Sequence, residues 1–183
     1  MHYRSIKSIV GLFVVIGVFC FAVKPMPATT FDNNNGPELP AGCDSIQVPE
    51  GNKLAFHAYA RGAQVYKWNG ATWDFVAPVA TLYAESDYFG EVGTHYVGPQ
   101  WESKSGSKVK AARVPDTGCV PDSSAIAWLL LKKTQTSGNG IFTKVTYVQR
   151  TNTTGGVPPT DPGSPNEVRE VPYTAEYYFY RAE

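Results

Sequence analysis

The strongest constraint in this sequence is a series of short runs in which apolar and polar residues alternate. From residue 53 onward, about nine such runs follow one another, and Gly, Pro and Asn residues separate them. No segment after the N-terminal region has a long helical period. The runs cover 53–60, 63–68, 72–76, 80–84, 93–98, 107–114, 125–134, 142–150 and 173–181. The pattern predicts an all-β domain, a single antiparallel β-barrel or β-sandwich of about nine short strands.

The residues between the runs predict where the chain turns. Asn-Gly at 69–70 is a strong hairpin signal, and Arg-Gly at 61–62 predicts another turn. The run at 125–134 is more continuously apolar, which predicts a central strand. Pro and Gly are frequent in 151–170, so this segment is predicted to be a long loop, either functional or mobile.

The N-terminus has the pattern of a secretory signal. Arg4 and Lys7 precede an uninterrupted apolar run at 9–23, which is shorter than the ~20 residues that a membrane-spanning helix needs. We therefore expect a signal peptide over 1–24, which acts as a membrane anchor if it is not cleaved. A Pro- and Asn-rich flexible lead-in over 25–42 would follow, and then a single domain over 43–183. The predicted location is secreted, periplasmic or extracellular.

The charge balance argues against nucleic acid as a partner. The chain has 16 basic and 16 acidic residues, and removal of Arg4, Lys7 and Lys24 leaves 13 basic residues against 16 acidic ones. No basic block remains to contact phosphates.

Two cysteines remain after the predicted signal, Cys43 and Cys119. In an exported protein the default expectation is a disulfide, which would close a long loop. The alternative is a zinc site that combines both cysteines with His57 and His95. No close ligand spacing such as C-x-x-C supports a metal site, so none is predicted.

The segment 92–109, VGTHYVGPQWESKSGSKV, concentrates the chemically interesting side chains. In one interpretation His95, Tyr96, Trp101 and Glu102 surround a pocket, where the Trp stacks on a ligand and the Glu accepts hydrogen bonds. In the other, GTHYVG is a strand, GPQ is a turn, WES starts the next strand and Trp101 belongs to the core.

Alternation extends the set of candidate ligand-binding residues. In the last run, Ala175, Tyr177 and Phe179 share one face, and Thr174, Glu176, Tyr178 and Tyr180 share the other. Such faces combine aromatic bodies with polar tips, as an ordinary amphipathic surface or a ligand groove does. The candidate ligand-binding residues are His57, Tyr59, Tyr66, Trp68, His95, Tyr96, Trp101, Glu102, Glu176 and Tyr178.

Most enzyme classes lack their signature. No spacing singles out a carboxylate pair for glycoside hydrolysis, and no G-x-S-x-G motif is present. The Gly-rich SGNGIF at 137–142 lies between two β-type runs, so it predicts a turn and not a nicotinamide-cofactor fingerprint. No catalytic residue and no cofactor are therefore predicted.

Five segments of the chain together resemble one family. They are LAFHAYARGAQVYKWNG, VGTHYVGPQWESKSGSKV, AIAWLLL, VTYVQRTNTTGGVPP and VPYTAEYYFYRA. In this order they resemble a family of exported proteins of bacteria, fungi and plants that is known as a domain of unknown function. The resemblance covers roughly 43–182 and brings no established activity. Some members carry the label malate dehydrogenase, which this sequence does not support.

Three functional hypotheses follow. The first is a non-catalytic binding module for a glycan or small amphipathic ligand, which would have several aromatic side chains on a concave face. The second is a structural or protein-interaction protein of the cell envelope, with those rings buried and no pocket. The third is a hydrolase of envelope material, with two of His57, His95, Glu102 and Glu176 within hydrogen-bonding reach and a shifted pKa. The oligomeric state and any protein partner stay open.

Overall fold

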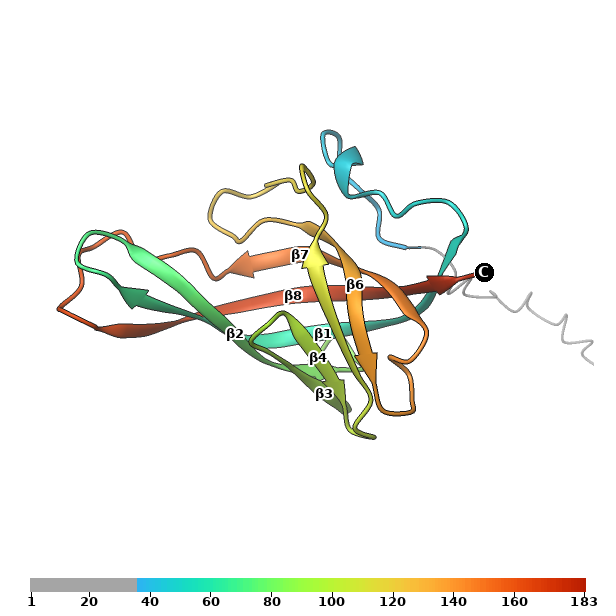
Figure 1. The fold of residues 1–183 in the computed structure, drawn as a ribbon. Helices are drawn as coiled ribbons and strands as arrows, with labels where there is room; N and C mark the ends of the chain where they lie inside the picture. Colours follow the sequence, from blue (N-terminus) through green and yellow to red (C-terminus); the bar gives the residue numbers. More distant parts are fainter. Residues whose placement is uncertain (1–35) are drawn as a thin grey trace, which may run out of the picture. The chain divides into compact units, whose positions relative to one another are not determined.

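Eight antiparallel strands close into a barrel in the computed structural model, which describes residues 36–183 (Figure 1). The strands are β1 (Asn52–Trp68), β2 (Trp73–Tyr83), β3 (Glu91–Tyr96), β4 (Gln100–Ser103), β5 (Lys108–Arg113), β6 (Leu129–Ser137), β7 (Val145–Gly155) and β8 (Val168–Ala182). Each strand pairs with its neighbours in the chain, and β8 pairs with β1. The predicted all-β fold is confirmed, and the barrel replaces the sandwich alternative.

The predicted signal peptide, 1–24, lies outside the described residues, as does the part of the predicted lead-in before residue 36. A short 3₁₀-helix, η1 (Asp44–Ile46), precedes the barrel. Within residues 36–183, no helix reaches the length and apolar character needed to cross a membrane.

The turn predicted at 61–62 is wrong, because these residues lie in the middle of β1. Gly62 pairs with Ala80 of β2 on one side and with Tyr173 of β8 on the other. A Cβ atom at Gly62 would collide with the Val79 carbonyl oxygen. The glycine therefore permits a close approach between strands and does not turn the chain.

Other predicted strand boundaries also differ from those in the structure. The runs at 53–60 and 63–68 form the single strand β1, and those at 72–76 and 80–84 form β2. Gln100–Ser103 adds the short strand β4, so eight strands replace the expected nine. The central strand predicted at 125–134 starts only at Leu129. Residues 125–128 instead belong to the β5–β6 connection, where Trp128 bridges to Cys119 of the same connection and Ala125 bridges to Gly156, which follows β7. Strand β7 continues to Gly155, so the β7–β8 connection covers 156–167 rather than 151–170.

Two other turns were predicted correctly from their residues. The hairpin predicted at 69–70 is confirmed: Asn69 Oδ1 accepts hydrogen bonds from the amides of Ala71 and Thr72, and Gly70 has a φ of 104°. The Gly-rich segment after Ser137 is a turn between β6 and β7, as predicted.

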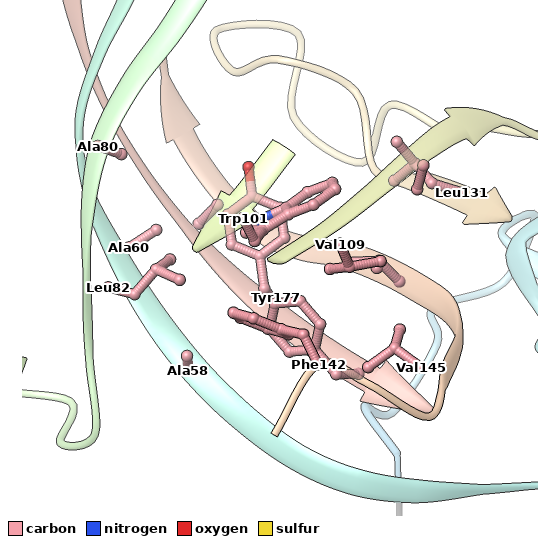
Figure 2. Packing of buried hydrophobic residues seen from close by; sticks show 14 of the residues in the cluster. Ala58, Ala60, Ala80, Leu82, Trp101, Val109, Leu131, Phe142, Val145 and Tyr177 are labelled. Carbon is pink, nitrogen blue, oxygen red and sulfur yellow. The ribbon is translucent and has the colours of Figure 1, made fainter. Parts of the chain in front are cut away.

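The barrel interior is filled by alternate residues of each strand. In β8, Tyr173, Ala175, Tyr177 and Phe179 are buried, as the alternation predicted, and they join the main core. Figure 2 shows how Tyr177, Phe142 and Trp101 face the small residues Ala58 and Ala60 of β1. Small residues on one wall thus make room for large rings from the other. The core members are Ala58, Ala60, Ala80, Leu82, Trp101, Val109, Ala111, Leu131, Phe142, Val145, Val148, Tyr173, Ala175, Tyr177 and Phe179.

A second apolar cluster lies on the outside of the barrel, between residues 39–48 and strands β6 and β7. It contains Cys43, Ile46, Trp128 and Leu130. Gln149 Nε2 donates a hydrogen bond to the Ile46 carbonyl oxygen at 2.8 Å. The predicted disulfide between Cys43 and Cys119 is present in this cluster. It attaches the segment before β1 to the β5–β6 connection.

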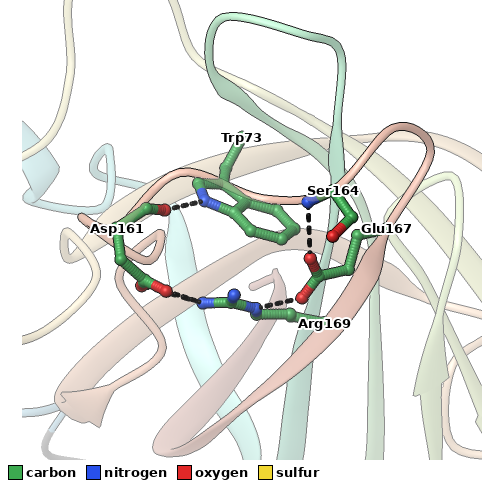
Figure 3. A network of polar contacts seen from close by, with 5 residues as sticks. All are labelled: Trp73, Asp161, Ser164, Glu167 and Arg169. Carbon is green, nitrogen blue, oxygen red and sulfur yellow. Dashed lines mark hydrogen bonds and ion pairs between the residues drawn. The ribbon is translucent and has the colours of Figure 1, made fainter.

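The β7–β8 connection is held by a polar network around Trp73 (Figure 3). The Trp73 indole N–H donates to the Asp161 carbonyl oxygen at 2.8 Å. The guanidinium of Arg169 pairs with the carboxylates of Asp161 and Glu167 at 2.7 and 2.6 Å, and it lies 4.6 Å from the Trp73 ring. Glu167 also accepts a hydrogen bond from the Ser164 amide. These hydrogen bonds lower the pKa of both carboxyl groups, so the network is fully charged at neutral pH.

We expect the disulfide to raise the stability of the barrel. It joins residues 76 positions apart, and the chain-entropy model gives about 4 kcal/mol for a loop of this length. Replacing both cysteines in Cys43→Ala/Cys119→Ala should lower the melting temperature by about 10 °C, since 1 kcal/mol corresponds to ~2–4 °C in a domain of this size. Thermal unfolding followed by circular dichroism measures the difference. Equal melting temperatures for the wild type and the double variant would contradict the expectation.

Candidate functional site

A cavity of about 570 Å³ opens at one end of the barrel. Strands β1, β2, β3, β4, β6, β7 and β8 contribute its walls, and three connections, at 97–99, 114–128 and 156–167, contribute its rim. Its volume lies within the roughly 300–1,000 Å³ range of pockets that bind small molecules. The lining residues are Gln64, Tyr66, Phe75, Val76, Pro78, His95, Gly98, Pro99, Trp101, Val120, Ser123, Ala125, Ile126, Ala127, Leu129, Leu131, Arg150, Val157, Pro158 and Tyr177.

The barrel interior is solid at the other end because aromatic rings fill it. The rings of Phe56 and Phe179 stack with centroids 4.4 Å apart, and Phe142 packs against both. Trp101 separates this filled half from the cavity: its ring makes an edge contact with Phe179 and also lines the cavity. Toward the rim, by contrast, the connection before β6 contributes the small residues Ser123, Ala125 and Ala127. The cavity therefore lies where the chain has small residues in place of large aromatic ones.

His95 is a neutral polar group in the cavity wall. It is 3% exposed, and its ring stacks on Trp101 at 4.4 Å. Its Nδ1 lies 2.9 Å from the Gln100 carbonyl oxygen, so the tautomer with a proton on Nδ1 donates there. Burial lowers the pKa of His95 to about 3, because the charged form loses its hydration; the Gln100 carbonyl opposes this shift and the charge of Arg150 adds to it. The ring is therefore uncharged at neutral pH.

Arg150 is the charged side chain of the cavity. Its Nε and Nη2 donate to the carbonyl oxygen of Ala127 at 3.1 and 2.7 Å, which holds the guanidinium against the β5–β6 connection. Within the described residues it forms no ion pair with a carboxylate. The cavity thus carries a positive charge that the neighbouring side chains do not neutralise.

Three of the ten candidate residues from the sequence line this cavity: Tyr66, His95 and Trp101. The hydroxyl of Tyr66 donates to the Gly156 carbonyl oxygen at 2.7 Å, which connects β1 to the rim. Trp101 is buried, as the core interpretation of 92–109 predicted, yet it also faces the cavity. The two interpretations of that segment therefore apply to the same residue.

Four other candidates form a cluster on the outer face of β1 and β8. His57 Nε2 lies 2.9 Å from Glu176 Oε2, and Tyr178 donates to the same oxygen at 2.8 Å. The His57 ring packs between Tyr59 and Tyr178, with centroids 4.4 and 4.1 Å away. Burial raises the pKa of Glu176, but the close contact with His57 and the hydrogen bond from Tyr178 outweigh it and leave a net lowering. The hydrolase hypothesis required such a pair, but none of these residues lines the cavity.

The remaining candidates lie apart from both groups. Tyr96 donates to Glu102 at 2.6 Å, and Lys108 pairs with the same carboxylate at 3.1 Å. These contacts, the one from Tyr96 first, lower the pKa of Glu102. Trp68 packs against Trp73 at the far end of the β1–β2 hairpin.

The histidines and cysteines do not meet as the zinc alternative required. The cysteines are bonded to each other, His57 is on the outer face and His95 is inside. In the part of the chain that the structure describes, no group of three or more His, Cys, Asp or Glu side chains is arranged to hold a metal ion.

The sequence analysis did not select three polar residues of the cavity: Gln64, Arg150 and Tyr177. Gln64 and Tyr66 are two positions apart in β1, and Arg150 is two positions after the buried Val148 in β7. Period-two alternation was therefore the signal that places them inside. Alternation does not tell which of the inward-facing residues line a cavity.

Comparisons with known proteins give a family but no activity. The family model described as "Protein of unknown function (DUF3455)" matches residues 49–181, which covers the whole barrel except the last residue of β8. No curated protein and no solved structure matches the chain.

Burial of neutral His95 should make the protein less stable in acid. The folded-state pKa lies below the ordinary value of 6.5, so between pH 6.5 and about 3 the unfolded chain binds a proton that the folded one does not. Stability therefore decreases as the pH is lowered, by about 2 kcal/mol between pH 6.5 and 4.5 from this group alone.

The variant His95→Asn tests this expectation, because its amide retains a donor for the Gln100 carbonyl. Urea unfolding at pH 6.5 and 4.5 measures the free energy of unfolding of both proteins. The variant should lose about 2 kcal/mol less than the wild type over this interval. The same loss in both proteins would show that His95 is protonated in the folded state or exposed.

Proposed function

We propose that this chain, which belongs to the DUF3455 family of proteins of unknown function, binds one small amphipathic molecule inside its barrel. The observation that carries the proposal is the cavity, which is blocked at one end by aromatic rings and open at the other. Eight-stranded barrels have interiors that side chains fill completely or that hold one small ligand. Here aromatic rings fill one end of the interior, and the cavity lies beyond them.

The lining supports an amphipathic ligand over a glycan. Val, Ile, Leu and Pro side chains dominate the rim and upper walls, and the polar groups are few. Three residues that line the cavity, Phe75 and Val76 of β2 and Val120 of the rim, are 55%, 49% and 60% exposed. Exposed apolar side chains around an opening suit the entry of a hydrocarbon body. A glycan would instead need many hydrogen-bonding groups, and no Asp or Glu of the described chain lines the cavity to accept from its hydroxyls.

The other functions have weaker support. A purely structural envelope protein was expected to have no pocket, and the cavity argues against it. A hydrolase would use the pair of His57 and Glu176, but a convex outer face does not exclude water or orient a substrate.

Export of the protein forms part of the proposal. The apolar run at 9–23 after Arg4 and Lys7 supports a secretory signal. The disulfide between Cys43 and Cys119 adds support, since such bonds persist in oxidising compartments. Mass spectrometry of the N-terminus of the protein from its native host tests this: a mature chain that begins after residue 22 is expected, and an intact Met1 in a cytosolic fraction would contradict export.

Filling the cavity should weaken binding without unfolding the barrel. The neutral fluorescent probe N-phenyl-1-naphthylamine is expected to bind the wild type, with a rise in its emission. In Leu129→Trp, a half-buried wall residue gains volume toward the hollow, and probe affinity should fall by about tenfold or more because the apolar contact area is lost.

The matched control is Ile141→Trp. This residue is 49% exposed in the turn at the filled end, so the substitution also adds an indole but leaves the cavity unchanged. Its probe affinity should equal that of the wild type. The proposal fails if the wild type does not bind the probe, or if both variants change its affinity equally.

A further inference from the structure

The one cation of the cavity has unused hydrogen-bonding capacity. Arg150 donates through Nε and Nη2 to a single carbonyl oxygen, that of Ala127. Its Nη1 has no acceptor among the described residues. A guanidinium offers its N–H groups as a planar fork that matches the two oxygens of a carboxylate. The free edge of this fork lines a cavity in which the structure describes no carboxylate.

Other donors of the cavity wall also lack partners. Gln64 Nε2, Trp101 Nε1 and Tyr177 Oη are buried and make no hydrogen bond of normal geometry within the described part of the chain. Tyr177 nevertheless lies close to Tyr173 and Arg150, and Gln64 lies close to Tyr173. All three side chains line the cavity. An amide nitrogen and an indole nitrogen can only donate, so the missing partner is an acceptor. Buried polar groups without a partner are uncommon in folded proteins, and an unfilled ligand site is one cause.

The remaining titratable groups of the cavity do not balance this charge. His95 is neutral, and burial raises the pKa values of Tyr66 and Tyr177, so both phenols stay protonated at neutral pH. The interior therefore has an excess of donors and one positive charge. An unpaired cation in a partly desolvated site is costly, and an anionic ligand would remove that cost.

We infer that the ligand is an amphipathic carboxylic acid whose carboxylate pairs with Arg150 inside the barrel. One guanidinium matches one negative charge, and the apolar rim surrounds the hydrocarbon part. The inference rests on the proposed function, because it specifies the chemistry of the molecule in the same cavity.

The experiment compares two competitors that differ only in the head group. Decanoate and decan-1-ol each displace N-phenyl-1-naphthylamine from the purified protein at neutral pH. The wild type should bind decanoate about tenfold or more tightly than decan-1-ol, because a hydrogen bond to a charged group is worth more than one to a hydroxyl. In Arg150→Met, which keeps most of the length of the side chain without its charge, this preference should disappear, because the affinity for decanoate should fall much more than the affinity for decan-1-ol.

Each outcome separates the two proposals. If the probe binds the wild type but both competitors displace it equally well, the ligand site is real and the carboxylate inference is wrong. If the probe does not bind, the proposed function itself fails. Should Arg150→Met not fold, Arg150→Lys tests the same pairing: it should still prefer decanoate, with a smaller ratio than the wild type because an ammonium group lacks the planar fork. An unchanged ratio in a folded Arg150→Met overturns the inference.

Discussion

The pairing of the first strand with the last is the contact on which the rest of the structure depends. Strands β1 and β8 pair from Asn52–Ala182 to Lys67–Val168 with one register shift, the longest pairing in the sheet. This pairing closes the barrel, removes the free edges of the sheet and separates an inside from an outside. Once the barrel is closed, its interior is a fixed volume that side chains fill or leave empty. The size and polarity of the cavity therefore depend on which side chains point into the barrel.

The interior is filled unevenly, and this decides where polar chemistry can occur. At one end Phe56, Phe142 and Phe179 pack against one another and leave no room. Beyond Trp101 the cavity is lined by the polar side chains of Gln64, His95 and Arg150. His95 and Arg150 hydrogen-bond to backbone carbonyl oxygens. Inside a barrel the effective dielectric constant is lower than in water, so a charge there interacts more strongly with a ligand. The same burial keeps His95 neutral and leaves Arg150 as the source of charge.

The outer face shows that proximity of reactive groups does not make a site. His57, Glu176 and Tyr178 meet at hydrogen-bonding distances, as an acid–base pair and its partner would. Their positions follow from the register of β1 and β8, in which His57 pairs with Tyr178 and Tyr59 with Glu176. Cross-strand pairs of this kind stabilise a sheet through stacking and hydrogen bonds. The pairing of β1 with β8, which closes the barrel, is therefore enough to explain why these side chains cluster.

Local sequence patterns were enough to predict the all-β class of fold, the two faces of the last strand and the disulfide. Alternation is a property of the strand alone, so it correctly assigned Tyr177 and Phe179 to one side of β8 and Glu176 and Tyr178 to the other. The sequence also selected Tyr66, His95 and Trp101 as candidate ligand-binding residues, together with seven residues that lie outside the cavity.

Only the tertiary structure decided that Gly62 continues a strand, since its neighbours Val79 and Ala80 come from a different part of the chain. Likewise, only closure of the barrel brings Gln64, Arg150 and Tyr177 around one hollow. Local patterns report which way a side chain points, whereas an empty volume depends on residues that are far apart in the sequence and meet only in the folded chain.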